Sequence, residues 1–232
     1  DCTVRLWRTD TGACVSVLSG HSKAVVSLVL IRGGTTPEPS AAPTATTATT
    51  AAPSDPQIVR ANSHVLGDPA DGRVTLVEFL DLECEACAAV FPFVEGLRET
   101  YAGKVRFVIR YFPLPGHANA VNAALAVEAA AQQGRLEDMY TILYRSQAEW
   151  GERQESQAEL FRGLAEELGF NMGAYDAAIA DPATAARVEL DRGDAEGLGL
   201  QGTPSFFLNG EPLELTSAED VTAAIDAALA AP

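Results

Sequence analysis

The most constraining feature of the sequence is a pair of cysteines, Cys84 and Cys87, at the junction of a strand and a helix. Residues 74–80, VTLVEFL, are apolar and rich in strand formers, as expected of a buried strand. A short acidic turn follows, and a helical pattern begins at Cys84. Helical winding places residues three apart on one face, so the two sulfurs are expected to lie close enough to form a disulfide. The junction therefore predicts dithiol redox chemistry.

The two cysteines are expected to differ in reactivity. Cys84 lies at the positive end of the helix dipole, near unpaired backbone N–H groups that stabilise a thiolate. The thiolate, not the thiol, is the nucleophile. A helix N-terminus lowers the pKa of a cysteine to about 3.5–7.5 and so raises the fraction of thiolate. We therefore expect Cys84 to be the exposed, attacking sulfur, and Cys87, which faces the core, to resolve the mixed disulfide. A static disulfide and half of a metal site are the alternative interpretations.

Composition narrows the classes of function. The formal net charge of −16 argues against a nucleic-acid partner, because no basic patch is available to release counterions. The sequence has neither a second CxxC nor a following pair of histidines that would indicate zinc, so no metal and no organic cofactor is expected. It also has no HExxH and no phosphate-binding glycine loop. His117, one of three histidines, is expected to make a structural hydrogen bond rather than to act in catalysis.

The chain divides into three segments by composition. Residues 1–32 hold two runs of alternating strand formers, and residues 1–29 resemble a fragment of a WD repeat through D-x-T-V-R-L-W, T-G-x-C and L-x-G-H. A single such unit cannot bury its own faces, so an independent domain is not predicted there. Residues 33–56 are rich in Pro, Thr and Ala and predict a disordered linker. Residues 57–232 predict one folded domain.

The linker also bears on location. Segments of this composition commonly tether exported domains, so we expect an extracytoplasmic protein. No stretch reaches the roughly 18–20 apolar residues of a membrane span. The best candidate, AVVSLVLI at 24–31, is less than half that length. Because the chain begins at Asp1 rather than at Met, the sequence leaves open a membrane tether upstream, and we expect the full-length form to be anchored.

Residues 57–232 alternate between strand and helix patterns. SHVLGDPADG, at 63–72, is expected to be a loop. Pro92 is expected to kink the helix that begins at Cys84. The Asn209-Gly210 turn predicts a hairpin. The expected strands are 74–80, 104–112, 205–208 and 212–215, and the expected helices are 84–101, 118–132, 136–145, 157–168, 173–180, 183–198 and 217–229.

This order of elements is the thioredoxin arrangement, an α/β fold, with a helical insertion at about 117–182. From about residue 63 to the end, the chain resembles the DsbA-like thiol-disulfide oxidoreductases through EFLDLECEAC, FPLPGHANAVNAALAVEAAAQQGR and GLGLQGTPSFFLNG. The resemblance implies an enzyme that acts on protein thiols and disulfides, with a redox partner still to be identified. Disulfide formation in exported proteins is the expected activity. A reductase or isomerase of the same fold, or a non-catalytic metal-binding thioredoxin-like module, are the alternatives.

The resemblance also implies roles for residues outside the cysteine pair. Thr203 and Pro204 would form a cis-proline element that binds an extended substrate. Glu78 would be a buried catalytic acid that passes a proton to or from Cys87. Arg110 would supply the cation that pairs with Glu78, because an unpaired buried charge is costly. Two solvated residues at a sheet edge are the alternative for Glu78 and Arg110.

The Glu85-Ala86 dipeptide between the cysteines is expected to modulate the attacking sulfur. Strongly oxidising members of the family have a histidine in this dipeptide. Here Asp81, Glu83 and Glu85 crowd the sulfur instead, and negative neighbours disfavour a thiolate. We therefore predict a Cys84 pKa above that of those members and a less oxidising potential.

Overall fold

The computed structural model describes residues 3–7, 14–19, 57–67, 73–214 and 217–231, in two compact units that comprise residues 1–50 and 51–232. In the first unit, β1 (Thr3–Trp7) pairs antiparallel with β2 (Cys14–Ser19), as the alternating strand formers predict. The linker predicted at 33–56 lies outside the described residues. Among the described residues, none of the helices combines the length and the apolar character that crossing a membrane requires.

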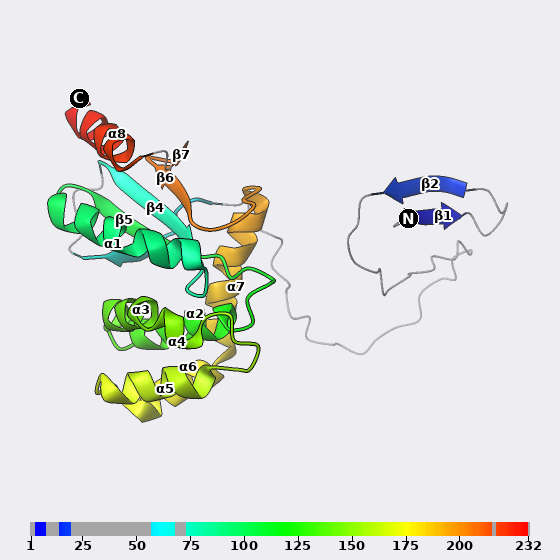
Figure 1. Ribbon diagram of the computed structural model, residues 1–232, viewed down its shortest axis with the longest axis horizontal. Helices are drawn as coiled ribbons and strands as arrows, with labels where there is room; N and C mark the ends of the chain where they lie inside the picture. The colour runs from blue at the N-terminus through cyan, green and yellow to red at the C-terminus, as the bar shows by residue number, and fades with distance from the viewer. Residues whose placement is uncertain (1–2, 8–13, 20–56, 68–72, 215–216, 232) are drawn as a thin grey trace, which may run out of the picture. The chain divides into compact units, whose positions relative to one another are not determined.

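The second unit is built on a five-stranded sheet with the strand order β3-β5-β4-β6-β7 (Figure 1). The central strands β4 (Thr75–Leu80) and β5 (Arg106–Tyr111) are parallel. A parallel pair needs a crossover, and α1 (Glu85–Thr100) supplies it. The strands β6 (Ser205–Leu208) and β7 (Glu211–Leu213) add antiparallel on the β4 side. The α/β class expected from the sequence is confirmed.

One strand of the sheet differs from expectation. Residues 63–72 are predicted as a loop, but β3 (His64–Leu66) pairs antiparallel with β5, with His64 opposite Ile109. Three residues are too few for a hydrophobic period to show in the sequence. This strand is therefore defined by its pairing with β5 and not by its own sequence pattern.

The two faces of β4 are covered by different helices. On one face, Leu76 and Leu80 belong to the core that contains the apolar side of α1. On the other face, Val77 and Phe79 pack in a cluster with Ala195 of α7 (Pro182–Gly197). This alternation follows from the period of two along a strand. The C-terminal helix α8 (Ala218–Ala230) buries Val221 and Ile225 in the α1 side of the core.

The helical insertion gathers at one end of the sheet, around α2 (Ala120–Ala131) (Figure 1). Ala123, Ala126 and Ala130 of α2 are fully buried, and their small side chains let neighbouring helices approach closely. The predicted helices match those observed to within two residues, except that the sequence analysis missed the four-residue α4. The remaining helices of the insertion are α3 (Leu136–Arg145), α4 (Gln147–Trp150), α5 (Ala158–Glu167) and α6 (Met172–Ala180).

Candidate active site

The two cysteines occupy the first turn of α1. Cys84 is the N-cap residue, with extended backbone at φ −70° and ψ 124°, and its carbonyl accepts the bond from Ala88 N at 3.1 Å. The Cys84 N–H donates to the Asp81 carbonyl at 3.2 Å and so closes the turn that leads out of β4. Both cysteines are free thiols, so the structure describes the dithiol form.

Both sulfurs are more enclosed than the sequence suggests. Cys84 is 6% exposed and Cys87 is fully buried. The expectation of an exposed Cys84 is therefore wrong in degree, although Cys84 remains the more accessible of the two. The Cys84 thiol donates to the Thr203 carbonyl at 3.4 Å, which shows that the loop before β6 lies directly against the sulfur.

This loop contains the cis peptide bond Thr203–Pro204. It leads into β6, whose Ser205 pairs with Phe79 on β4, and this pairing carries the loop to the end of α1. Within the described residues, the buried Thr203 hydroxyl has no hydrogen-bond partner while Cys84 is protonated. It is therefore an available donor when Cys84 becomes a thiolate.

The pKa values of the two thiols are shifted in opposite directions. Hydrogen bonding from the Cys87 side chain is the largest cause that lowers the pKa of Cys84 to about 5; the Thr203 side chain and backbone N–H groups of the first helical turn add to it, and burial opposes it. Burial is the largest cause that raises the pKa of Cys87, followed by its hydrogen bond to Cys84 and the nearby charge of Glu78. Cys84 is therefore the thiolate at neutral pH.

Asp81, the first acid of the active-site turn, is held by hydrogen bonds to three other residues. Asp81 is buried and its carboxylate accepts from Glu83 N at 2.8 Å, from Leu114 N at 2.8 Å and from His117 Nδ1 at 2.6 Å. Local charge does not hold the pKa of Cys84 at or above its ordinary value, because hydrogen bonds to the sulfur outweigh it. The comparison with histidine-containing members of the family stays a prediction.

Asn119 ties the same turn to the insertion. Its backbone N–H donates to Glu83 Oε2 at 2.6 Å, and its buried side-chain amide donates to the carbonyls of Arg153 and Glu155 at 2.9 and 3.1 Å. Its Oδ1 accepts from Gln157 N at 2.7 Å. The sequence analysis missed this residue, although it lies in the GHANA motif used for the family resemblance.

Gln147 of α4 makes a second link between the insertion and the turn. Its side-chain Nε2 donates to the carbonyls of Leu82 and Cys84 at 2.8 and 3.0 Å, in a buried position. The sequence gives no signal for this role because α4 is a single turn long. The insertion therefore supports the backbone on which the attacking cysteine is placed.

Glu78 is buried on the α1 side of β4 and is 4% exposed. Burial is the largest cause that raises its pKa to about 8, and the charges of Glu95 and Cys84 add to it. Its Oε2 has no hydrogen-bond partner among the described residues. A carboxyl group in this position is neutral at pH 7 and has a proton to give.

The predicted pair between Glu78 and Arg110 is wrong. In the parallel register Glu78 lies opposite Ile109, whereas Arg110 lies opposite Phe79 and its guanidinium is 5.2 Å from that ring. Because neighbouring residues on a strand point to opposite faces, Arg110 faces α7 while Glu78 faces α1. The structure thus separates the two groups by the thickness of the sheet.

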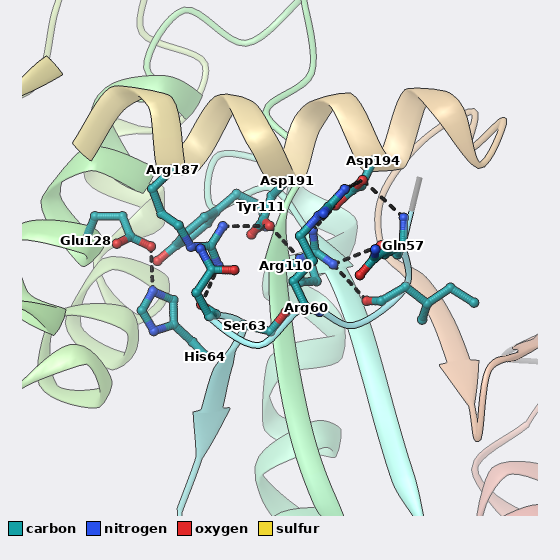
Figure 2. A network of polar contacts seen from close by, with 12 residues as sticks. Gln57, Arg60, Ser63, His64, Arg110, Tyr111, Glu128, Arg187, Asp191 and Asp194 are labelled. Carbon is teal, nitrogen blue, oxygen red and sulfur yellow. Dashed lines mark hydrogen bonds and ion pairs between the residues drawn. The ribbon is translucent and has the colours of Figure 1, made fainter. Parts of the chain in front are cut away.

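Arg110 is instead the centre of a buried ionic network (Figure 2). Its Nε and Nη2 lie 2.5 Å from Asp191 and Asp194 of α7, both of which are buried. Its Nη1 donates to the carbonyls of Gln57 and Ile58 at 2.9 Å each. The network joins α7, β5 and the segment that precedes β3. The contacts of Arg110 are therefore those of a residue that holds the fold together.

An apolar groove of about 540 Å³ lies beside the cis-proline. It is lined by Val90 of α1, by Leu198 and Leu200, by Pro204, and by residues of β6 and β7. Among the residues that the structure describes, no three His, Cys, Asp or Glu side chains are arranged to hold a metal ion.

Comparisons with known proteins agree with this geometry. A model of the family described as thioredoxin matches residues 60–227. The structure is similar to that of a thioredoxin-like oxidoreductase from Silicibacter pomeroyi DSS-3, with a TM-score of 0.63, 29% identity, and coverage of 75% of this chain and 95% of that chain. It shares its fold with alpha-DsbA1 of Wolbachia pipientis, with a TM-score of 0.65, 21% identity, and coverage of 74% and 93%.

Curated relatives carry a different name. The Na(+)/H(+) antiporter NhaA of Herminiimonas arsenicoxydans is 35% identical over 176 residues, which are 75% of this chain and 26% of that protein. NhaA 3 of Salinispora tropica is 38% identical over 148 residues, which are 63% of this chain and 22% of that protein. The chain thus spans about a quarter of the length of these relatives.

Proposed function

Because this chain belongs to the thioredoxin family, we propose that its Cys84–Cys87 couple forms disulfide bonds in exported proteins. The DsbA-like resemblance seen in the sequence is confirmed at the level of family and fold. One observation carries the proposal. Cys84, whose pKa is lowered, is the N-cap residue of α1 and contacts Thr203, the residue before the cis-proline. Cys87, whose pKa is raised, is fully buried one turn further along the helix.

The first step of the proposed reaction is attack by a substrate thiolate on the Cys84 sulfur of the oxidised enzyme. A bond forms between the substrate sulfur and Cys84, the Cys84–Cys87 bond breaks, and Cys87 leaves as a thiolate. The buried Cys87 thiolate then takes a proton, because burial and the neighbouring Glu78 strongly favour its neutral form. Glu78, which is protonated at neutral pH, is the proposed donor.

In the second step, another thiolate of the substrate attacks the substrate sulfur of the mixed disulfide. The substrate disulfide forms and Cys84 leaves as a thiolate, which its lowered pKa makes a good leaving group. The substrate has lost two electrons and the cysteine couple has gained them. A redox partner that itself carries a disulfide or another two-electron acceptor must then reoxidise the couple.

Substrate binding is proposed at Thr203 and Pro204, with the neighbouring apolar groove as the site for side chains of an unfolded polypeptide. The Thr203 carbonyl lies 3.4 Å from the Cys84 sulfur, so a strand that bonds to the Thr203 backbone is held within reach of the attacking atom. The groove contributes apolar surface that has no requirement for a particular sequence.

The low pKa of Cys84 supports oxidation rather than reduction as the proposed direction. Stabilising the thiolate stabilises the reduced enzyme, and a dithiol that is stable when reduced is a strong oxidant. Disulfides persist in oxidising compartments, so an extracytoplasmic location fits this activity. A reductase or isomerase of the same fold remains the second candidate, because the same couple carries electrons either way.

The Cys87→Ser variant tests the order of attack. Without the resolving sulfur, the Cys84 thiolate that attacks a disulfide of an unfolded substrate protein cannot be released by Cys87. Mixed disulfides at Cys84 should therefore accumulate with disulfide-containing substrates and should disappear on a gel after treatment with a reductant. The matched Cys84→Ser variant should form none. Adducts that persist in Cys84→Ser, or their absence in Cys87→Ser, contradict the mechanism. Oxidative refolding of a reduced disulfide protein, compared with the reduction of insulin by the wild type, distinguishes the two directions.

A further inference from the structure

The loop after β5 brings a histidine to the active-site turn. His117 Nδ1 lies 2.6 Å from Asp81 Oδ2, and the Asp81 side chain is completely buried whereas that of His117 is 25% exposed. A buried carboxylate requires partners, and Asp81 has them on both oxygens. In the part of the chain that the structure describes, no hydrogen bond is made by His117 Nε2. The imidazole is thus fixed through one nitrogen only.

Asp81 connects this imidazole to the attacking cysteine. The carboxylate of Asp81 holds His117, and the carbonyl of the same residue accepts the N–H of Cys84 at 3.2 Å. The bond from Leu114 N to Asp81 Oδ2 fixes the other end of the loop at 2.8 Å, and His117 N in turn donates to Leu114 O at 3.1 Å. The position of His117 relative to Cys84 is therefore determined by hydrogen bonds rather than by a free loop.

The titratable groups that act on the imidazole are acidic. The pKa of His117 is raised: burial opposes the shift, but the hydrogen bond and charge of Asp81 exceed it, with Glu83 and the Cys84 thiolate adding to them. His117 in turn acts on the carboxylates of Glu85 in α1 and Glu152 after α4. The titratable groups that face it are Asp81, Glu83, Cys84, Glu85 and Glu152.

We propose that the imidazolium of His117, bound to Asp81, is a positioning residue that stabilises the Cys84 thiolate and supplies the positive charge that the Glu85-Ala86 dipeptide lacks. The proposal deepens the proposed function and rests on it. The structural hydrogen bond that the sequence analysis expects of His117 is present, to Asp81, and the proposal adds an electrostatic role to it. The fixed cation offsets part of the field of the carboxylates in the active-site turn, in addition to the hydrogen bonds that lower the pKa of Cys84.

In the reaction, the charge acts when Cys84 leaves the mixed disulfide. The sulfur gains a full negative charge at that moment, and the proposed role of His117 is to stabilise this charge without giving up its proton. The effect is smaller than that of the hydrogen bonds made directly to the sulfur, which are the leading causes of the shift. An opposite charge at contact distance changes a pKa by about 1–3 units, so a weaker influence of about 0.5–1 unit is expected here.

The first test is the titration of the Cys84 thiolate by its ultraviolet absorbance. His117→Gln keeps a donor for Asp81 but removes the charge, and should raise the pKa of Cys84 by about 0.5–1 unit, whereas His117→Lys should restore it. His64→Gln is the matched control, because His64 pairs with Glu128 at 2.5 Å on the outer strand β3. Equal pKa values in His117→Gln and the control would overturn the proposal.

The second test needs no change at His117. Coupling between two sites is reciprocal, so a thiolate that His117 stabilises must raise the pKa of His117 by the same factor. The imidazole proton resonances of His117 should titrate at a higher pH in the reduced wild type than in Cys84→Ser. Identical titration curves would refute the coupling. Neither measurement depends on turnover, so failure of the Cys87→Ser trapping experiment would reject the proposed function without bearing on the measured coupling.

Discussion

Replacement of Glu78 by glutamine should change how the stability of the protein depends on pH. The folded state raises the pKa of this carboxyl from 4.5 to about 8, mainly through burial. The folded protein therefore holds a proton that the unfolded chain releases above pH 4.5. Stability is unaffected by this group below pH 4.5, falls as pH rises towards 8, and is constant above that value.

The magnitude follows from the size of the shift. Each pH unit between the two pKa values removes about 1.4 kcal/mol from the free energy of unfolding. At pH 7 the wild type has thus lost about 3 kcal/mol on account of Glu78, which is a large share of the roughly 5–15 kcal/mol of a typical domain. The glutamine of the Glu78→Gln variant does not titrate. The free energy of unfolding of this variant, relative to that of the wild type, should therefore rise by about this amount between pH 4.5 and 7.

Urea unfolding of both reduced proteins at pH 5, 6, 7 and 8 measures the effect. The difference in free energy of unfolding should grow with pH, at a slope near 1.4 kcal/mol per unit that flattens towards pH 8. Glu99→Gln, at an exposed position of α1, is the matched control for the loss of one carboxylate. A constant difference between Glu78→Gln and the wild type from pH 5 to 8 would show that Glu78 is ionised and solvated, and would remove the proposed proton donor.

Two further predictions concern the ionic network and the attacking sulfur. Arg110→Gln removes the central cation of the network but leaves Arg187 on Asp191 and Arg60 on Asp194, so it should destabilise the protein by about 1–3 kcal/mol in urea unfolding. Arg192→Gln, which breaks only exposed pairs on α7, should change stability by less than about 1 kcal/mol, and equal losses in the two variants would contradict the structural role of Arg110. Alkylation of the reduced protein by iodoacetamide should reach half its maximal rate near pH 5, the pKa of Cys84, and a midpoint near pH 8.5 would show that the thiolate is not stabilised.

The sequence predicts the active-site framework well because each part has a strong local signal. A β-branched run, the CxxC spacing and a helical period place Cys84 and Cys87 at the start of α1. The Gly-Thr-Pro turn before a short apolar strand places Pro204 beside them through the pairing of β4 with β6. These features depend on residues close together in the chain, so short sequence patterns are enough to predict them.

The parts that the sequence does not predict depend on register and on long-range contacts. Whether Glu78 and Arg110 share a face is decided by the parallel pairing of β4 with β5, and a shift of one residue reverses the answer. Gln147 and Asn119 act on carbonyl, N–H and carboxylate groups more than 30 residues away, which no periodicity reveals. His117 likewise acquires its partner Asp81 only when the loop after β5 folds back on the turn.

The network around Arg110 also has a mechanical consequence. Gln57 and Ile58 are held by Arg110 through their carbonyls, and the Gln57 N–H donates to Asp194 at 3.1 Å. A pulling force applied to the chain at Gln57 is therefore transmitted to Arg110 on β5 and to Asp194 on α7 before it reaches β3. The load thus enters at the centre of the sheet and on a covering helix, and the edge strand β3 is spared from peeling.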